Sequence, residues 1–393
     1  MGYVDDTMCM DKDNVGTTFS CKIIENTLDE LSLEAHKDKT KHVICGNKEW
    51  VEEMTKKLEN NPAEIQNFRV KVEKSEKYLG VKIVSGEICD IINANIKFKS
   101  SKSYQAATAI RQRVRDIRME RVGALQASAL LLRSVIVPIL TYATECWLHT
   151  TDKQYHEMEM IMAQAMSIVL SIPKNSCYEA MLLEIQGYHL EQWMDCLKLC
   201  YFSKKIHVKK SGILYNIIKK DIAREDLTGF VGDVKKLCAK YKLPDVTLLP
   251  LRTRYIKSAC KDLSRRRCMM ATLTNKKVPS LLSPDQIDYN HYNLGVMEAR
   301  AITVMRTGNL IFKNWAHYKF SKKHMGDDRC MVPTCRERDT LNHVMKCEYY
   351  DTKFTQIHGN VKDWAEYLVA LNNERIKKFG QPLISCEGWT NTR

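Results

Sequence analysis

Two groups of residues in this chain have types and spacings suited to chemistry, and the first is a pair of carboxylates near its start. Asp5 and Asp6 follow Tyr3 and Val4, with short apolar stretches on both sides. Adjacent carboxylates repel each other, and a bound divalent ion relieves that repulsion. We therefore expect Met1–Met10 to form a β-hairpin with a metal-binding turn, and an ordinary Asx turn is the alternative.

The second group lies near the other end of the chain. Cys330, Cys335, His343 and Cys347 supply three thiolates and an imidazole within a short polar segment. That is a complete tetrahedral ligand set for Zn²⁺. Asp339-Thr340-Leu341 is expected to begin a helix that places His343 and Cys347 one turn apart on one face. A chance cluster in a chain with 15 cysteines is the alternative.

The segments after the acidic pair alternate between helix and strand patterns. An amphipathic helix is expected over 21–35, and a polar Lys-Thr turn within 36–46 leads into an apolar strand. A second helix is expected near Trp50–Leu58. Glu76–Ile83 is expected to be a short strand, with Gly80 where another backbone segment approaches closely.

In this order, the acidic hairpin, the helix, the Lys-Thr turn and the Tyr78-Leu79-Gly80 strand resemble the reverse transcriptases of non-LTR (LINE-like) retrotransposons. Arg133–Trp147 resembles the thumb-region helix of that family, which ends in a Tyr-(Gly/Ala)-x-Glu-x-Trp signature. Residues 172–176 and 306–310 resemble motifs that recur further downstream in that family, and the Cys/His cluster resembles its terminal zinc knuckle. The gap between Cys330 and Cys335 is wider than in the family, and no Pro-Asp of a restriction-like endonuclease follows the knuckle.

The resemblance implies RNA-directed DNA synthesis on an RNA template and a DNA primer or target. It makes Asp5 and Asp6 ligands of catalytic Mg²⁺. The residues implied to contact the nucleotide or the primer are Tyr3, Lys39, Tyr78, Leu79 and Gly80.

The same resemblance implies a first catalytic Asp and a fingers region upstream of the hairpin, which this chain does not contain. We expect a fragment of a transposable-element reverse transcriptase that binds template–primer nucleic acid and is not catalytic without the missing N-terminal polymerase half. The alternative is a non-catalytic zinc-knuckle protein that binds nucleic acid. Codons upstream of Met1 that continue into palm and finger motifs would distinguish the two.

Composition favours a polyanionic partner. The 393 residues carry a formal net charge of +14. The cysteines are scattered without a secretory signal, which indicates a reducing, intracellular location, and the resemblance implies a ribonucleoprotein in cytoplasm and nucleus. The apolar run of about 122–147 is interrupted by Gln126, Arg133 and Pro138, which favours a buried helix and no membrane span.

Basic residues gather in helical stretches that nucleic-acid phosphates would neutralise. A merely solvated, soluble helix is the alternative for the first of these stretches, which comprises Lys97, Lys99, Lys102, Arg111, Arg113, Arg115, Arg118 and Arg121. A later stretch comprises Arg252, Arg254, Lys257, Lys261, Arg265, Arg266 and Arg267. A Met-rich helix over 152–170 is expected to pack in the core.

The expected fold is an α+β remnant of a polymerase palm, followed by a mainly α-helical thumb and C-terminal region with a small zinc knuckle. The expected boundaries are 1–95 for the palm, 96–150 for thumb-like helices, 151–325 for a basic helical region, 326–350 for the knuckle and 351–393 for a C-terminal tail.

Overall fold

The structure is a computed structural model. It describes the chain except residues 1, 4–5, 9, 12, 117–123, 175, 209–211, 224–228, 275–295, 308–309, 311–328, 351–360, 381–382 and 385–393. The described residues are mostly helical, and their named strands all lie within the first 84 residues. This agrees with an α+β start followed by a helical remainder.

The N-terminal part combines two helices with short strands that pair only in twos. Among described residues they form four two-stranded ladders, β1–β2, β3–β6, β4–β5 and β7–β8, of which β3–β6 is parallel. The bounds are β1 Gly2–Tyr3, β2 Asp6–Thr7, α1 Asn14–Glu30, β3 Lys41–His42, α2 Lys48–Asn60, β4 Glu64–Ile65, β5 Phe68–Arg69, β6 Lys71–Val72, β7 Ser75–Tyr78 and β8 Val81–Val84.

The segment expected as one strand, Glu76–Ile83, is instead a β-hairpin. Tyr78 pairs with Val81, and the chain reverses at Leu79 and Gly80, whose φ angles are 45° and 82°. Two successive positive φ values define the turn that matches the twist of paired strands, and Gly tolerates such values. The single-strand prediction was therefore wrong, because the two-residue turn at Leu79-Gly80 divides the segment into two paired strands.

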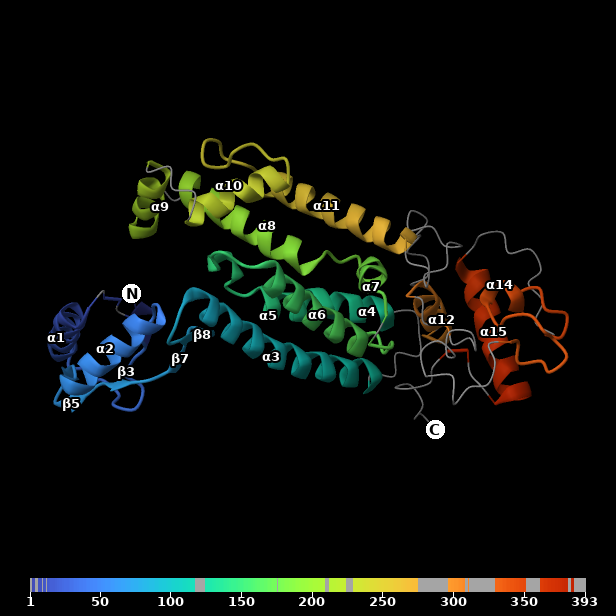
Figure 1. Ribbon diagram of the computed structural model, residues 1–393, viewed down its shortest axis with the longest axis horizontal. Helices are drawn as coiled ribbons and strands as arrows, with labels where there is room; N and C mark the ends of the chain where they lie inside the picture. The colour runs from blue at the N-terminus through green and yellow to red at the C-terminus, as the bar shows by residue number, and fades with distance from the viewer. Residues whose placement is uncertain are drawn as a thin grey trace.

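Helices stacked in layers make up the centre of the molecule (Figure 1). α3 packs on α5 and α6, these pack on α8, and α11 packs on α8 and α7. The bounds are α3 Ile88–Asp116, α4 Ala124–Leu131, η1 Leu132–Ile136, α5 Val137–Thr141, η2 Thr144–Cys146, α6 Asp152–Val169, α7 Tyr178–Glu184, α8 Leu190–Ser203, η3 Lys204–Val208, α9 Ile213–Ala223, α10 Phe230–Lys240 and α11 Thr253–Thr274.

The Met-rich helix forms where expected and faces the core. Its N-terminus is fixed by a capping box in which Thr151 and Gln154 exchange side-chain and backbone hydrogen bonds. Met158, Met162 and Met166 recur every four residues, and all three are buried. Flexible thioether side chains fill the space between α3 and α8, so the core prediction is confirmed.

The described part of the apolar run, 124–147, is helical from Ala124 to Thr141, and its C-terminal half is irregular. Pro138 has no N–H and its ring crowds the carbonyl four residues earlier, and a π-helical turn, η1, precedes it. Ala127–Cys146 is the one described segment long and apolar enough to cross a membrane, and 44% of its apolar window is buried. Leu132, Ile136 and Leu140 of this segment lie in the main core.

The C-terminal part contains three described helices: α12 Val296–Arg306, α14 Leu341–Val344 and α15 Val361–Phe379. α15 packs on α12 and places Leu368 and Leu371 in the same hydrophobic cluster as α3 and α6. The segment after the knuckle, expected to be a tail, therefore contains a core helix. Figure 1 shows α14 and α15 at the opposite end of the molecule from α1 and α2.

Candidate metal centre and basic surfaces

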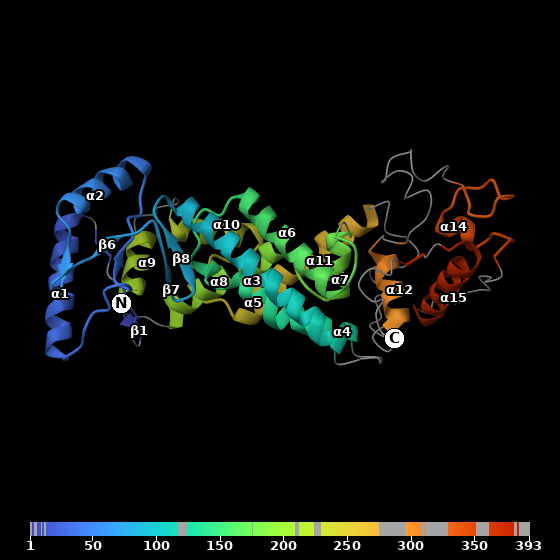
Figure 2. The same cartoon turned by 90° about the horizontal axis from the view of Figure 1, so that it is seen from below.

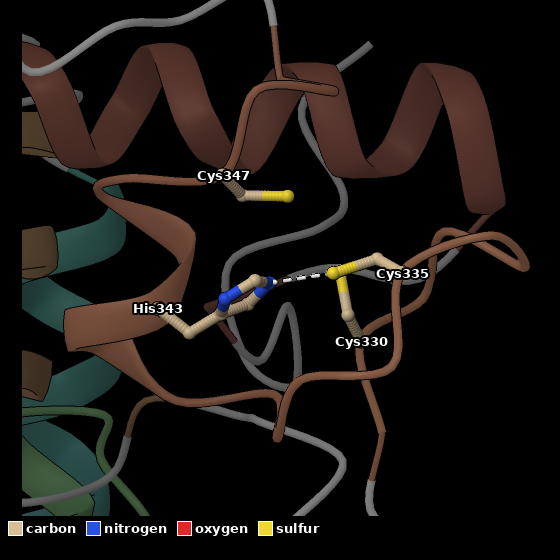
Figure 3. A group of neighbouring side chains, drawn as sticks. All are labelled: Cys330, Cys335, His343 and Cys347. Atoms are coloured by element: carbon tan, nitrogen blue, oxygen red, sulfur yellow. Dashed lines mark hydrogen bonds between the residues drawn. The ribbon is translucent and has the colours of Figure 1, made fainter.

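The predicted zinc ligands converge. The ligand atoms of Cys330, Cys335, His343 and Cys347 all lie within 4.8 Å of one another (Figure 3). Sγ of Cys335 is 3.3 Å from Nε2 of His343. A tetrahedral site with Zn–S of about 2.3 Å and Zn–N of about 2.0 Å needs ligand atoms roughly 3.5 Å apart. The cluster can therefore hold one zinc ion after only a small contraction.

Local backbone structure explains how His343 is placed. The Thr340 side chain accepts a hydrogen bond from the His343 N–H at 3.2 Å and so caps α14. The helix start expected at this point is confirmed. However, α14 ends at Val344, so Cys347 does not share a helix face with His343 as expected. A turn beyond the helix brings its sulfur back to the cluster.

The first two cysteines lie on a tight loop. The Cys330 N–H donates to the carbonyl of Glu337 at 2.7 Å, next to a bridge between Arg329 and Arg338. The Cys335 N–H donates to the carbonyl of Val332 at 3.0 Å. These bonds fold the segment back on itself, so both thiols point toward His343 (Figure 3).

A buried ion pair between Asp339 of the knuckle and Arg375 of α15 joins the two elements. The Arg375 guanidinium donates to both carboxylate oxygens of Asp339, at 3.0 and 3.1 Å, and both side chains are fully buried. The same guanidinium donates to the Tyr350 hydroxyl at 3.4 Å. Such bidentate pairs fix orientation as well as distance. The sequence did not predict a role for Arg375. Its partner Asp339 lies 36 residues earlier in the chain, and the residues around Arg375 do not indicate that pairing.

Burial favours the protonated form of two of the thiols, those of Cys330 and Cys347, when no metal is bound. It raises the pKa of Cys330 to about 12, and it also raises the pKa of Cys347. Metal binding must displace these protons, so zinc affinity should weaken as pH falls. Within the described part of the chain, no other set of three or more such ligands converges in this way. Cys386 lies outside it.

The acidic segment pairs as expected of a hairpin. Gly2 lies opposite Thr7 and Tyr3 opposite Asp6 in an antiparallel ladder, which confirms the strand pairing. Asp6 belongs to the second strand rather than to the turn, and Asp5 lies outside the described residues.

Lys39, implied to lie near the incoming nucleotide, is exposed on a turn. Its N–H donates to the carbonyl of His36 at 3.0 Å, which closes that turn.

Two motifs far apart in the sequence meet at the β7–β8 turn. The Tyr142 hydroxyl donates to the Leu79 carbonyl at 2.8 Å. A Cβ added to Gly80 would lie 3.2 Å from the Tyr142 ring, so the close neighbour of this glycine is a side chain and not another backbone segment as expected. The hairpin also packs on α3, as Figure 2 shows from below. The Tyr-Leu-Gly segment and the Tyr-Ala-Thr-Glu-Cys-Trp segment therefore form one surface.

An open groove of about 530 Å³ lies on this surface, between the hairpin and α3. Lys77 and Lys102 line it, with their ammonium groups 5.5 and 5.9 Å from the centre of the Phe98 ring. Tyr142 lies on the other side of the groove and is 53% exposed. Sequence reasoning had singled out Lys102 only as one residue of a basic stretch.

Lys99 corrects one expectation for the basic stretch. It is buried, and its ammonium donates to the carbonyls of Leu140 and Tyr142 at 3.0 and 2.6 Å. The same group lies 4.3 Å from the centre of the Trp147 ring. Burial lowers the pKa of Lys99 to about 7. This lysine lines the groove, but its ammonium group is engaged by the two carbonyls and joins α3 to the end of α5.

The other predicted basic residues occupy two helices. On α3, Arg113 is exposed and Arg111 half-buried, Arg115 lies in the last turn, and Arg118 and Arg121 are outside the described residues. On α11, Arg265 and Arg266 are exposed. Arg267 donates to Glu191 at 2.7 Å, so this arginine is engaged within the protein rather than free for phosphate.

Comparison with models of known protein families, with curated proteins and with solved structures finds no match to this chain.

Proposed function

We propose that this chain is the C-terminal part of a non-LTR retrotransposon reverse transcriptase and that it binds template–primer nucleic acid. The ordered motifs of the sequence support this proposal. The observation that carries it is the groove beside the Leu79-Gly80 turn. Tyr142 is hydrogen-bonded to that turn, and Lys77 and Lys102 line the same groove. The resemblance assigns the Leu79-Gly80 turn to the primer end and the segment of Tyr142 to the thumb. Both segments border the same basic surface.

The groove has the chemistry of a phosphate track. Lys77 and Lys102 are exposed, and Arg113 lies about three helical turns beyond Lys102 on the same face of α3. Cations of this kind contact phosphates and carry no sequence information. The exposed ring of Tyr142 adds a surface on which a sugar or a base can pack. The groove thus suits a nucleic acid of any sequence.

The catalytic roles rest on the resemblance. In this proposal Asp5 and Asp6 bind Mg²⁺, Tyr3 and Lys39 lie near the nucleotide, and the Leu79-Gly80 turn supports the primer end. The complete polymerase would work inside the cell as a ribonucleoprotein, with the missing polymerase half as its partner. The basic surfaces would serve nucleic acid rather than a membrane.

The test is binding of a labelled RNA–DNA template–primer duplex to the purified chain. Changing Lys77, Lys102 and Arg113 to Glu should weaken binding about tenfold or more. The slope of log affinity against log salt should become shallower by about 2 to 3, because each lost phosphate contact contributes about 0.9.

A matched control reverses three exposed lysines of the N-terminal part, Lys22, Lys56 and Lys71. It imposes the same change in net charge on a different surface and should leave duplex binding within about twofold. Equal losses in both variants would show general attraction to a cationic protein and would reject the groove.

A non-catalytic zinc-knuckle protein that binds nucleic acid is the second candidate, and the converging Cys/His cluster favours it. Both candidates predict binding. They differ in the upstream reading frame, which runs into palm and finger motifs only for the first.

A further inference from the structure

α11 carries a row of cations distinct from the groove. Lys257, Lys261 and Arg265 follow one another at four-residue intervals, so they lie along one flank of the helix. All three are exposed, and none forms an ion pair with a described residue. Arg267 points elsewhere, because it is bound to Glu191. Asp262 lies between Lys261 and Arg265 in sequence, but its carboxylate accepts from Ser258 at 3.4 Å and no ion pair joins it to the row. Three like charges in a row favour an anionic ligand.

Aromatic side chains lie beside this row. The Lys261 ammonium is 5.9 Å from the centre of the Tyr188 ring, and Tyr188 stacks on Trp193 at 4.9 Å with an interplanar angle of 25°. Tyr188 and Trp193 are half-buried, and cations beside partly exposed aromatic rings hold phosphates and unpaired bases together. A duplex keeps its bases stacked inside and gains nothing from the rings, so a single strand fits better.

The α11 row and the α3 groove lie on opposite sides of the central layers. α3 packs on α6, α6 on α8, and α8 on α11, and Figure 1 shows α3 and α11 along opposite edges. Three helix spacings of about 8 to 10 Å each separate the two helix axes by roughly 25 Å. The α11 row and the α3 groove are therefore separate surfaces.

We infer that Lys257, Lys261 and Arg265, with the Tyr188–Trp193 pair, form a second nucleic-acid site, specific for single strands and occupied while the α3 groove holds a duplex. This inference rests on the proposed nucleic-acid binding and extends it. The chain would thereby hold two nucleic-acid segments at once, one on each side of its helical layers.

The experiment titrates the full chain with a labelled single strand of roughly ten nucleotides, alone and with the groove saturated by template–primer duplex. Wild type should bind both together, seen as energy transfer between labels on the two ligands. K257E/K261E/R265E should weaken single-strand binding about tenfold and reduce its salt slope by about 2, at 0.7 per contact. Duplex binding should change less than about twofold.

The variant with Lys77, Lys102 and Arg113 changed to Glu should weaken duplex binding and leave single-strand binding nearly unchanged. The control variant at Lys22, Lys56 and Lys71 should leave both affinities unchanged. If K257E/K261E/R265E alters the circular dichroism, the Gln triple variant replaces it, with the same expected direction. Trp193→Ala should weaken single-strand binding while leaving the duplex unaffected.

Displacement of the single strand by saturating duplex would mean one shared site and would overturn the second site while leaving the proposed function intact. Unchanged single-strand binding by the α11 variants would also overturn it. Unchanged duplex binding by the groove variant would instead count against the proposed function.

Discussion

Lys99 shows that a residue's charge pattern in sequence does not reveal its role. It belongs to a run of cations, yet its side chain satisfies two carbonyls at the end of α5 and lies over Trp147. A neutral amine has two N–H groups, which match these two acceptors. Burial therefore costs little once the extra proton is lost, and this agrees with a pKa lowered to about 7.

This gives a prediction for the pH dependence of stability. The folded-state pKa of Lys99 is about 7, below the value of 10.5 expected when unfolded. Between those values the unfolded chain binds a proton that the folded chain does not. The free energy of unfolding should therefore rise with pH across this window. Urea unfolding at several pH values should show this rise in wild type and a flatter profile in Lys99→Met. Identical profiles would contradict it.

Among the structural elements, the knuckle and α15 depend on each other. The knuckle segment is short and polar in sequence, yet Val332, Val344 and Tyr350 join the main hydrophobic cluster with α15. The Asp339–Arg375 pair adds a polar anchor, and removing one partner of such a buried pair costs about 3 to 5 kcal/mol. Zinc binding and packing against α15 therefore both stabilise the folded form of this segment.

We expect one zinc ion per chain, bound by the four residues of the cluster. Cys347→Ser should abolish zinc binding and loosen the knuckle while α3 to α11 stay folded, because those helices pack mainly on one another. Elemental analysis of protein purified without chelator measures the stoichiometry, and circular dichroism follows the helices. Cys89→Ser, at an exposed cysteine outside the cluster, is the control and should retain zinc. Wild-type protein without zinc would make the cluster a coincidence.

At the scale of the whole molecule, the acidic hairpin and the Cys/His cluster belong to opposite ends of an elongated chain, with the basic helices between them (Figure 1). The hairpin therefore cannot draw on the cluster for metal ligands. Two-metal phosphoryl transfer needs carboxylates from more than one element, with the ions about 4 Å apart. Asp5 and Asp6 are adjacent in the sequence and so supply carboxylates from one segment.

The isolated chain should therefore bind a primer–template but not extend it. The measurement is primer extension on an RNA template with Mg²⁺. Robust extension by wild type that is lost in Asp5→Ala would overturn this prediction and would require a further carboxylate in the site.

Several features followed from the sequence because they depend on neighbouring residues. The four-residue recurrence of Met158, Met162 and Met166 predicts a buried helix face whatever the partner. The Cys/His spacing predicts a ligand set, because a short loop brings its own ends together. The helix near Trp50–Leu58 was expected for the same reason and extends over Lys48–Asn60.

Other features required the folded chain, because they arise from contacts between residues distant in sequence. The residues around Lys99 do not predict its hydrogen bonds to the carbonyls of Leu140 and Tyr142. Likewise, the residues around Asp339 do not predict its ion pair with Arg375. The separation of the basic residues onto two sides of the molecule is of the same kind. Charge is a property of each residue, whereas the surface that it joins depends on how α3 and α11 pack around the helices between them.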